Sequence, residues 1–165
     1  MDETERVVLL LGSNIEPREK YLEDAISLLE GYLGKSTAVS EVYESEPWGF
    51  EAKISFYNRA VVFDTDKTPE ELLHLCLQTE KTLGRVRNNI EGYTSRTMDV
   101  DMLYFGNKII NSEQLTVPHP RLPLRRFALQ PMVEVMPELI HPILNKNQEE
   151  LLLECPDQSE VKLVN

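Results

Sequence analysis

The order in which strand-like and helix-like patterns follow one another constrains the fold of this chain more than any other feature. The continuous apolar run Val7–Leu11 predicts a buried strand. Helical spacing of apolar residues from Tyr21 to Leu33 predicts a helix, for which Gly34 can supply the C-terminal cap. Alternating residues predict a weaker strand over 38–44 and a stronger one over 57–64. The chain therefore begins in the order strand, helix, strand, strand.

A second helix and a fourth strand complete this pattern. Thr68 offers an N-cap, Pro69 suits the first helical position, and Glu71 can close a capping box. This helix is expected to end at Gly84, and the segment 99–105 then alternates and becomes apolar, which is typical of a strand. The whole order predicts a ferredoxin-like α+β sandwich, a mainly antiparallel sheet with two helices on one face.

The remaining third of the chain is expected to add small elements. Ile109–Ile110 predicts a short edge strand, and short helices are expected near 125–136 and 148–154, as a helical C-terminal extension. The length of 165 residues, with no repeat and no linker-like segment, fits one domain covering 1–165.

Charge and hydropathy exclude several classes of partner. The formal net charge of −11 argues against nucleic acids and anionic membranes. The apolar runs are too short to span a bilayer, and the acidic N-terminus does not resemble a signal peptide. Cys76 and Cys155 are isolated, without the spacing of metal ligands. Cys76 falls on the apolar face of a predicted helix, which favours a core or inert thiol over a disulfide. We expect a monomeric cytoplasmic protein that acts on small molecules.

Positive charge is concentrated in one stretch of this acidic chain. Six of the nine arginines lie between Gly84 and Gln130, and that segment carries a net charge of +3. The guanidinium group suits bidentate binding of phosphate. The chain has no P-loop, so side chains such as Arg85, Arg87 and Arg96 would have to bind any phosphate. The stretch predicts a site for a small anionic ligand.

Two aspartates lie two residues apart on the fourth predicted strand. On a strand, Asp99 and Asp101 leave the same face, with Cα atoms about 6.5–7 Å apart. Two like charges this close are unfavourable without a cation or a proton. Mg²⁺ prefers a few carboxylates together with phosphate oxygens and water. The pair therefore predicts magnesium bound with a polyphosphate. The alternative, two exposed carboxylates on an edge strand, is disfavoured because the apolar downstream half of the strand predicts a central position in the sheet.

One histidine fits a phosphate site better than the other two. His119 lies between two prolines and close to Arg121 and Arg125, so its imidazole could bond a phosphate. His74 lies inside a predicted helix and His141 precedes a proline, which favours structural roles for both.

Four aromatic residues and one asparagine could bind a flat ring. In this hypothesis the rings enclose the ligand and the amide reads its polar edge. Each aromatic residue is also compatible with a place in the core. The residues concerned are Trp48, Phe56, Asn58, Tyr93 and Phe127.

Together these motifs resemble the 6-hydroxymethyl-7,8-dihydropterin pyrophosphokinase family of folate biosynthesis. The matching motifs are 11–14 (LGSN), 84–87 (GRVR), 96–101 (RTMDVD), 103–106 (LYFG) and 115–120 (LTVPHP). The resemblance implies a ferredoxin-like fold and an ATP- and magnesium-dependent diphosphokinase that transfers diphosphate to the pterin hydroxymethyl group and releases AMP. It implies two magnesium ions on Asp99 and Asp101, with Arg85 and Arg96 stabilising the transferred phosphates.

The resemblance also implies binding roles by position. Residues matching the nucleotide and phosphate site are Leu73, Glu80, Arg87, Met102, Thr116, His119, Arg121 and Arg125. Residues matching the pterin site are Ser45, Pro47, Trp48, Phe56, Asn58, Tyr93 and Phe127. The chain departs from the family pattern at 91–96, where EGYTSR replaces a usual Arg-Trp-Gly-Pro-Arg loop and Tyr93 stands for the tryptophan, and at Glu46, where proline is common.

Two rival hypotheses remain open on the residues alone. One is another metal-dependent nucleotidyl or phosphoryl transferase that uses the same aspartate pair. The other is a regulatory module that binds a small molecule without turnover, a common use of ferredoxin-like sandwiches.

Overall fold

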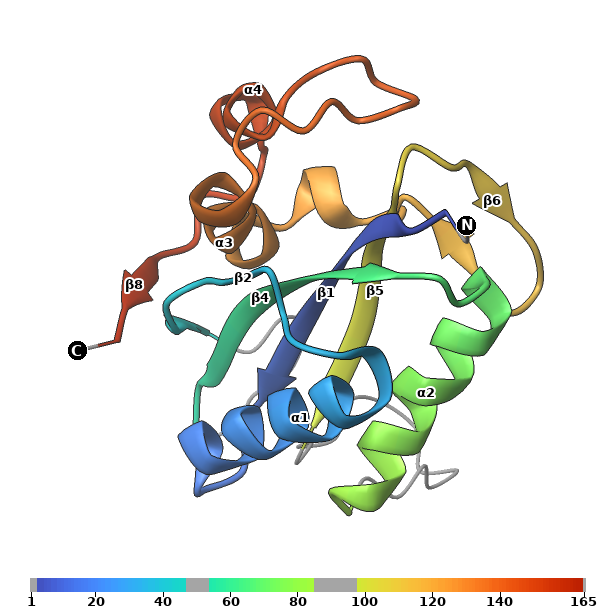
Figure 1. The fold of residues 1–165 in the computed structure, drawn as a ribbon. Coiled ribbons are helices and arrows are strands. Elements are labelled where there is room, and N and C mark those ends of the chain that lie inside the picture. The colour runs from blue at the N-terminus through green and yellow to red at the C-terminus, as the bar shows by residue number, and fades with distance from the viewer. Residues whose placement is uncertain (1–2, 47–53, 85–97, 165) are drawn as a thin grey trace.

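A computed structural model describes residues 3–46, 54–84 and 98–164 of the chain (Figure 1). The strands are β1 (Glu5–Ser13), β2 (Ala38–Val39), β3 (Tyr43–Ser45), β4 (Phe56–Thr65), β5 (Asp99–Phe105), β6 (Ile110–Asn111), β7 (Thr116–Val117) and β8 (Val161–Leu163). The helices are α1 (Arg18–Leu33), α2 (Pro69–Thr82), α3 (Arg126–Val135) and α4 (Gln148–Glu154), with a short 3₁₀ helix at Leu122–Leu124.

The main sheet has the predicted ferredoxin-like topology. Within the described residues it contains six strands in the order β5-β1-β4-β3-β8, with β2 also paired to β4, and every pairing is antiparallel. The predicted second strand is divided into β2 and β3, because residues 40–42 leave the ladder. The predicted edge strand at Ile109–Ile110 is β6 instead, and it pairs with β7 in a separate two-stranded sheet.

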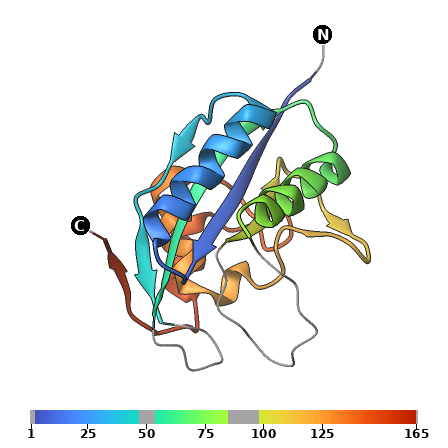
Figure 2. The same cartoon turned by 90° about the horizontal axis from the view of Figure 1, so that it is seen from below.

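Helices cover both faces of the sheet, whereas the sequence predicted two helices on one face. Successive side chains of β1 alternate between the faces. Val7, Leu9 and Leu11 pack in the cluster under α1 and α2, and Val8 and Leu10 pack in the cluster under α3 and α4. Figure 2 shows α1 and α2 on the near side of the sheet and α3 behind it. The all-apolar run of β1 reflects this double burial.

The local helix signals are confirmed at α2. The Thr68 side chain accepts a hydrogen bond from the Glu71 amide, and the Glu71 carboxylate accepts one from the Thr68 amide. Pro69 is the first residue of the helix. At α1, Gly34 follows the last turn with a φ of 88°, a conformation that a residue without Cβ adopts at little cost.

The C-terminal segment contributes a strand that the sequence did not reveal. β8 pairs with β3, in the register Val161 to Ser45 and Leu163 to Tyr43. The Asp157 carboxylate accepts a hydrogen bond from the Arg126 amide at the first residue of α3. The end of the described chain therefore holds both a sheet edge and the start of α3.

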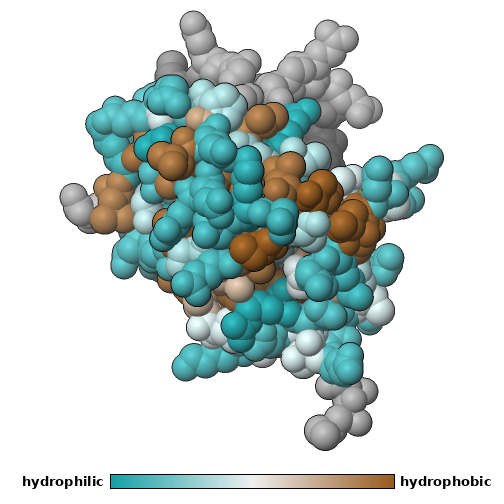
Figure 3. Space-filling view, turned by 90° about the horizontal axis from the view of Figure 1, so that it is seen from above, coloured by the Kyte–Doolittle hydropathy of each residue, from teal (hydrophilic) through white to brown (hydrophobic). Residues whose placement is uncertain are grey.

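The surface is polar with scattered apolar side chains. The view from above shows brown apolar groups separated by teal hydrophilic residues (Figure 3). Exposed apolar residues near α4 include Ile140, Ile143 and Leu153. Among the helices of the described residues, none combines the length and the apolar character needed to cross a bilayer.

Candidate active site

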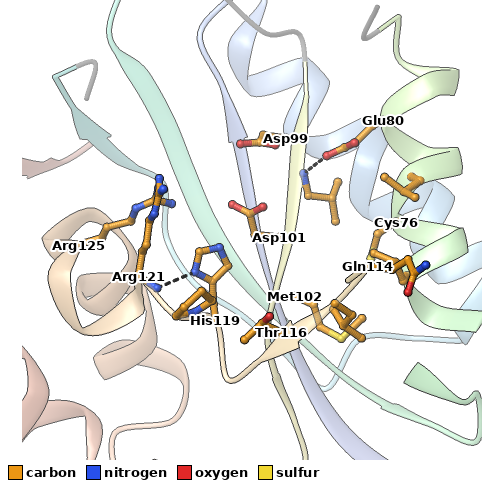
Figure 4. Close-up of a pocket in the computed structure, with 15 residues that line it drawn as sticks. Cys76, Glu80, Asp99, Asp101, Met102, Gln114, Thr116, His119, Arg121 and Arg125 are labelled. Atoms are coloured by element: carbon orange, nitrogen blue, oxygen red, sulfur yellow. Dashed lines mark hydrogen bonds between the residues drawn. The ribbon is translucent and has the colours of Figure 1, made fainter. Parts of the chain in front are cut away.

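The two aspartates lie at the start of β5, which is an edge strand of the main sheet and not the central strand that its apolar half predicted. Asp99 pairs with Gly12 of β1 and Asp101 pairs with Leu10, so both carboxylates project from the same face of the sheet as the one on which α3 packs. Both residues are half-buried, while Val100 between them is in the core on the other face. Figure 4 shows the two carboxylates pointing toward His119 and the nearby arginines.

A buried glutamate fixes this strand from the neighbouring helix. The backbone amide of Val100 donates to Glu80 Oε2 at 2.8 Å (Figure 4). Because β5 is an edge strand, an outward amide there has no strand partner. Glu80 is only 3% exposed and supplies that acceptor from α2. The contact therefore holds the segment between the two aspartates in place.

A pocket of about 720 Å³ lies against this edge. That volume is within the range of ligand and cofactor sites. Seven of the eight residues that the sequence suggested for nucleotide or phosphate line it together with the two aspartates: Leu73, Glu80, Met102, Thr116, His119, Arg121 and Arg125. The eighth, Arg87, lies outside the described residues. Segments far apart in the sequence thus converge on one pocket.

His119 is held as a neutral imidazole. Its Nδ1 accepts a hydrogen bond from the Arg121 amide at 3.2 Å, and its own amide donates to the Leu103 carbonyl at 2.9 Å. Burial and, to a smaller extent, the positive charges of Arg125 and Arg121 together lower the pKa of His119 to about 4, against the opposite effect of Asp99. With Nδ1 accepting, the remaining proton is on Nε2. The ring can therefore donate one hydrogen bond from Nε2.

A second group of candidate residues lies on the same face of the sheet, two strands away. Asn58 Nδ2 donates to Ser45 Oγ at 3.4 Å, and both residues are 4% exposed. Phe56 pairs with Ser45 in the sheet and so shares this face. Phe127 lies in the first turn of α3, with the guanidinium of Arg125 5.5 Å from its ring centroid. We call Ser45, Phe56, Asn58 and Phe127 the acceptor group, because they are the described residues among those that the sequence suggested for the pterin, the acceptor substrate.

Gly12 joins the two groups. It pairs with Asn58 on one side and with Asp99 on the other, so the three residues form a row across β4, β1 and β5. Two strand spacings place the Asn58 and Asp99 positions about 10 Å apart. Gly12 adds no side chain to this row, and the Asn58 amide lies over it, since a Cβ at Gly12 would be 2.7 Å from Asn58 Oδ1.

Six of the residues suggested by the sequence lie outside the described part of the chain. They are Pro47, Trp48, Arg85, Arg87, Tyr93 and Arg96. Their roles stay predictions from the sequence.

The cysteines and His141 agree with the structural roles expected of them. Cys76 and Cys155 are free and buried, and burial, followed by the charges of Glu80 and Asp101, raises the pKa of the Cys76 thiol. His141 is buried, and its Nδ1 accepts hydrogen bonds from the amides of Ile143 and Leu144. His74 is exposed on α2.

Sequence reasoning missed part of the site. Gln114 and Leu115 line the pocket because they directly precede β7, which lies beside β5, and Cys76 lines it from α2. Leu115 lies in the motif 115–120, but no chemical signal in the sequence marks Gln114 or Cys76 as pocket residues. The Gly12 position, in contrast, is within the motif LGSN, and its pairing with both Asn58 and Asp99 is a tertiary fact.

Comparison with known proteins gives a consistent family. Residues 8–137 match the model of the 7,8-dihydro-6-hydroxymethylpterin-pyrophosphokinase family. A 2-amino-4-hydroxy-6-hydroxymethyldihydropteridine pyrophosphokinase of Bacillus subtilis is 44% identical over 128 residues, which cover 77% of this chain and 75% of that protein. The folic acid synthesis protein fol1 of Pneumocystis carinii is 39% identical over 86% of this chain, but the match spans only 19% of that protein.

Solved structures show the same fold. A Plasmodium falciparum HPPK-DHPS structure with pteroate superimposes with a TM-score of 0.77 at 18% sequence identity. The match covers 93% of this chain and 45% of that one, so this chain spans less than half of the Plasmodium chain.

Proposed function

Since the chain belongs to the 7,8-dihydro-6-hydroxymethylpterin-pyrophosphokinase family, we propose that it transfers a diphosphate from ATP to the hydroxymethyl group of 6-hydroxymethyl-7,8-dihydropterin. The products are AMP and the pterin diphosphate, an intermediate of folate biosynthesis. The observation that carries this proposal is the row Asn58–Gly12–Asp99, which connects the acceptor group to the carboxylate pair at the pocket.

Asp99 and Asp101 are the residues that would hold magnesium. Their carboxylates share one face of β5 and line the pocket, and hard oxygen ligands suit this ion. The described residues contain no group of three or more metal-ligating side chains, and Mg²⁺ commonly takes its other ligands from phosphate and water. Two ions bound here would neutralise charge on the polyphosphate and help to align it.

The phosphates would be bound on the opposite wall of the pocket. His119 presents its Nε2 proton as a donor, and Arg121 and Arg125 supply positive charge. Phosphate oxygens are good acceptors for such donors. Phosphoryl-type transfer needs mainly alignment of the reactants and neutralisation of charge, and these three side chains can supply both to the phosphates. Arg85, Arg87 and Arg96 are proposed to join them on the sequence evidence alone.

The nucleotide would lie between α2 and the segment 114–116. Leu73 and Met102 offer apolar contact there, while Thr116 and Glu80 offer polar groups. In this arrangement the base would lie at one end of the pocket and the triphosphate would extend toward the aspartates.

The pterin would bind in the acceptor group. The amide of Asn58 and the hydroxyl of Ser45 can read the polar edge of the bicycle, and Phe56 and Phe127 can enclose its faces. Pro47, Trp48 and Tyr93 are proposed to complete this pocket. A flat bicycle with a one-carbon arm can extend from Asn58 across Gly12 toward Asp99, which brings the hydroxyl to the phosphates.

The test is an assay with ATP, magnesium and 6-hydroxymethyl-7,8-dihydropterin in which the nucleotide product is identified. We expect AMP, and we expect removal of magnesium by EDTA to abolish its formation. ADP as the product would favour another phosphoryl transferase, and binding without turnover would favour a regulatory module.

Matched variants test the carboxylate pair. Asp99→Ala and Asp101→Ala should abolish turnover with the fold intact. Asp64→Ala is the control, because Asp64 pairs with Arg6 at the far end of β4 and β1. Full magnesium-dependent turnover in both Asp99→Ala and Asp101→Ala would contradict the metal assignment.

A further inference from the structure

Arg18, the first residue of α1, reaches the beginning of β4 from the face opposite the acceptor group. Figure 1 shows the start of α1 beside the beginning of β4. Arg18 Nη1 donates to the Ser55 carbonyl at 2.9 Å and to Ser55 Oγ at 3.0 Å. Its guanidinium carbon is 3.7 Å from the centroid of the Tyr57 ring, a cation–π distance. One side chain therefore contacts two residues at the entry to β4.

The same arginine is connected to β3. Ser55 Oγ donates to Glu44 Oε2 at 2.7 Å, and Arg18 Nη1 is 3.7 Å from that carboxylate oxygen. On its other side, Arg18 Nε donates to Glu16 Oε1 at 2.9 Å. The Arg18 side chain is only 12% exposed, whereas its partners Glu16 and Glu44 are 58% and 38% exposed, so the guanidinium is covered while both carboxylates still reach water. We call Arg18, Glu44 and Ser55 the hairpin clamp.

The clamp lies directly behind the acceptor group. Glu44 precedes Ser45, and Ser55 precedes Phe56, and these two acceptor residues are register partners. Tyr57, under the guanidinium, pairs with Glu44, whereas Phe56 and Asn58 leave the other face. Arg18 therefore contacts residues adjacent in sequence to the acceptor group, on the opposite face of the sheet from the acceptor group itself.

We propose that Arg18 is a positioning residue for the pterin, because it fixes the ends of β3 and β4 that carry Ser45, Phe56 and Asn58. This inference rests on the proposed function of the acceptor group. The 3.4 Å contact between Asn58 and Ser45 joins the two strands, so its geometry depends on how the strand ends are held.

The effect should be specific to the acceptor. In the sheet order, β1 separates β4 from β5, and the nucleotide-lining residues are on β5, α2 and the segment 114–125. Within the described part of the chain, the hydrogen bonds and ion pairs of the clamp join Arg18, Glu44 and Ser55 to one another and to Glu16, and none reaches these elements. Loosening the clamp should weaken pterin binding and leave ATP binding alone.

The experiment compares Arg18→Met and Arg18→Lys with a matched control. Arg6→Met is the control, because Arg6 also ties a β1–β4 pair through Asp64, with bonds of 2.9 and 3.1 Å, at the far end of the sheet. For Arg18→Met we expect KM for the pterin to rise about tenfold while KM for ATP changes less than about twofold. Arg18→Lys keeps the charge but not the forked donor set, and should fall between Arg18→Met and the wild type. Arg6→Met should leave both KM values unchanged.

Several outcomes separate this inference from a purely structural role. An unchanged pterin KM in folded Arg18→Met, or equal rises for pterin and ATP, would overturn it. If Arg18→Met does not fold, Ser55→Ala removes one hydroxyl of the clamp and should raise the pterin KM alone, by about threefold. An unchanged pterin KM in folded Ser55→Ala would likewise overturn the inference. Wild-type protein that forms no AMP would instead reject the proposed function, so the two failures are distinguishable.

Discussion

Replacement of Gly12 by alanine tests whether the Asn58 amide binds the pterin. A Cβ at this position would lie 2.7 Å from Asn58 Oδ1, closer than a carbon and an oxygen normally approach. The next contacts, with Asn58 Cγ at 3.7 Å and the Tyr57 carbonyl at 3.9 Å, are ordinary. The amide is therefore the group that has to move, and the backbone of β1 can stay in place.

The structure separates the effects of this substitution on affinity and on stability. A buried amide that leaves its contact with Ser45 loses about 1–3 kcal/mol, which corresponds to about 5- to 150-fold in affinity if the same amide binds the pterin. Replacement of glycine by alanine also restricts the unfolded chain, which stabilises the protein by about 0.4–1 kcal/mol. We expect the pterin KM to rise at least about fivefold, while the free energy of unfolding falls by about 2 kcal/mol or less.

Steady-state kinetics and urea unfolding of Gly12→Ala provide the measurements. Gly31→Ala is the matched control, because a Cβ on Gly31 meets nothing within 4 Å and the residue lies inside α1. That control should gain about 0.5–1 kcal/mol of stability with unchanged kinetics. A pterin KM equal to that of the wild type in folded Gly12→Ala would refute the proposal that Asn58 binds the pterin.

Three further predictions concern the supports of the site. The folded protein holds His119 with a pKa of about 4, below the usual 6.5, so its contribution to stability is present above pH 6.5 and is lost as the pH falls toward 4. His119→Gln should flatten the stability profile in that window, and an unchanged profile would contradict the burial of a neutral ring. Glu80→Ala removes the hydrogen-bond acceptor of the Val100 amide and should lower the free energy of unfolding by about 1–3 kcal/mol. Glu80→Gln keeps an acceptor oxygen and should lower the free energy of unfolding by less. Equal decreases for the two variants in urea unfolding would count against this contact. Asp157→Ala removes the acceptor of the first amide of α3 and should cost about 0.5–2 kcal/mol, with Asp157→Asn closer to wild type, and an unchanged urea midpoint would show that this cap is not important.

Local chemistry in the sequence predicted much of the fold. The capping box at Thr68 and Glu71 and the glycine after α1 depend only on neighbouring residues, and the structure confirms both. The alternation of Asp99, Val100 and Asp101 predicted that both carboxylates share a face. β8 was missed because three residues of mixed polarity form a strand only when β3 offers an edge to pair with. The second helical layer was missed because α3 and α4 were expected only as a C-terminal extension, and their packing on the sheet is a long-range contact.

By itself, the sequence determined the order of the elements, the aspartate pair, and, through motif resemblance, the family. These depend on residue identity and short spacing, which the chain carries without folding. Only the tertiary structure decided that Gly12 lies between Asn58 and Asp99, that Glu80 supports the Val100 amide, and that Arg18 reaches behind Ser45 and Phe56. Those facts depend on strand register and on which element covers which face, and register is set by burial of the whole sheet.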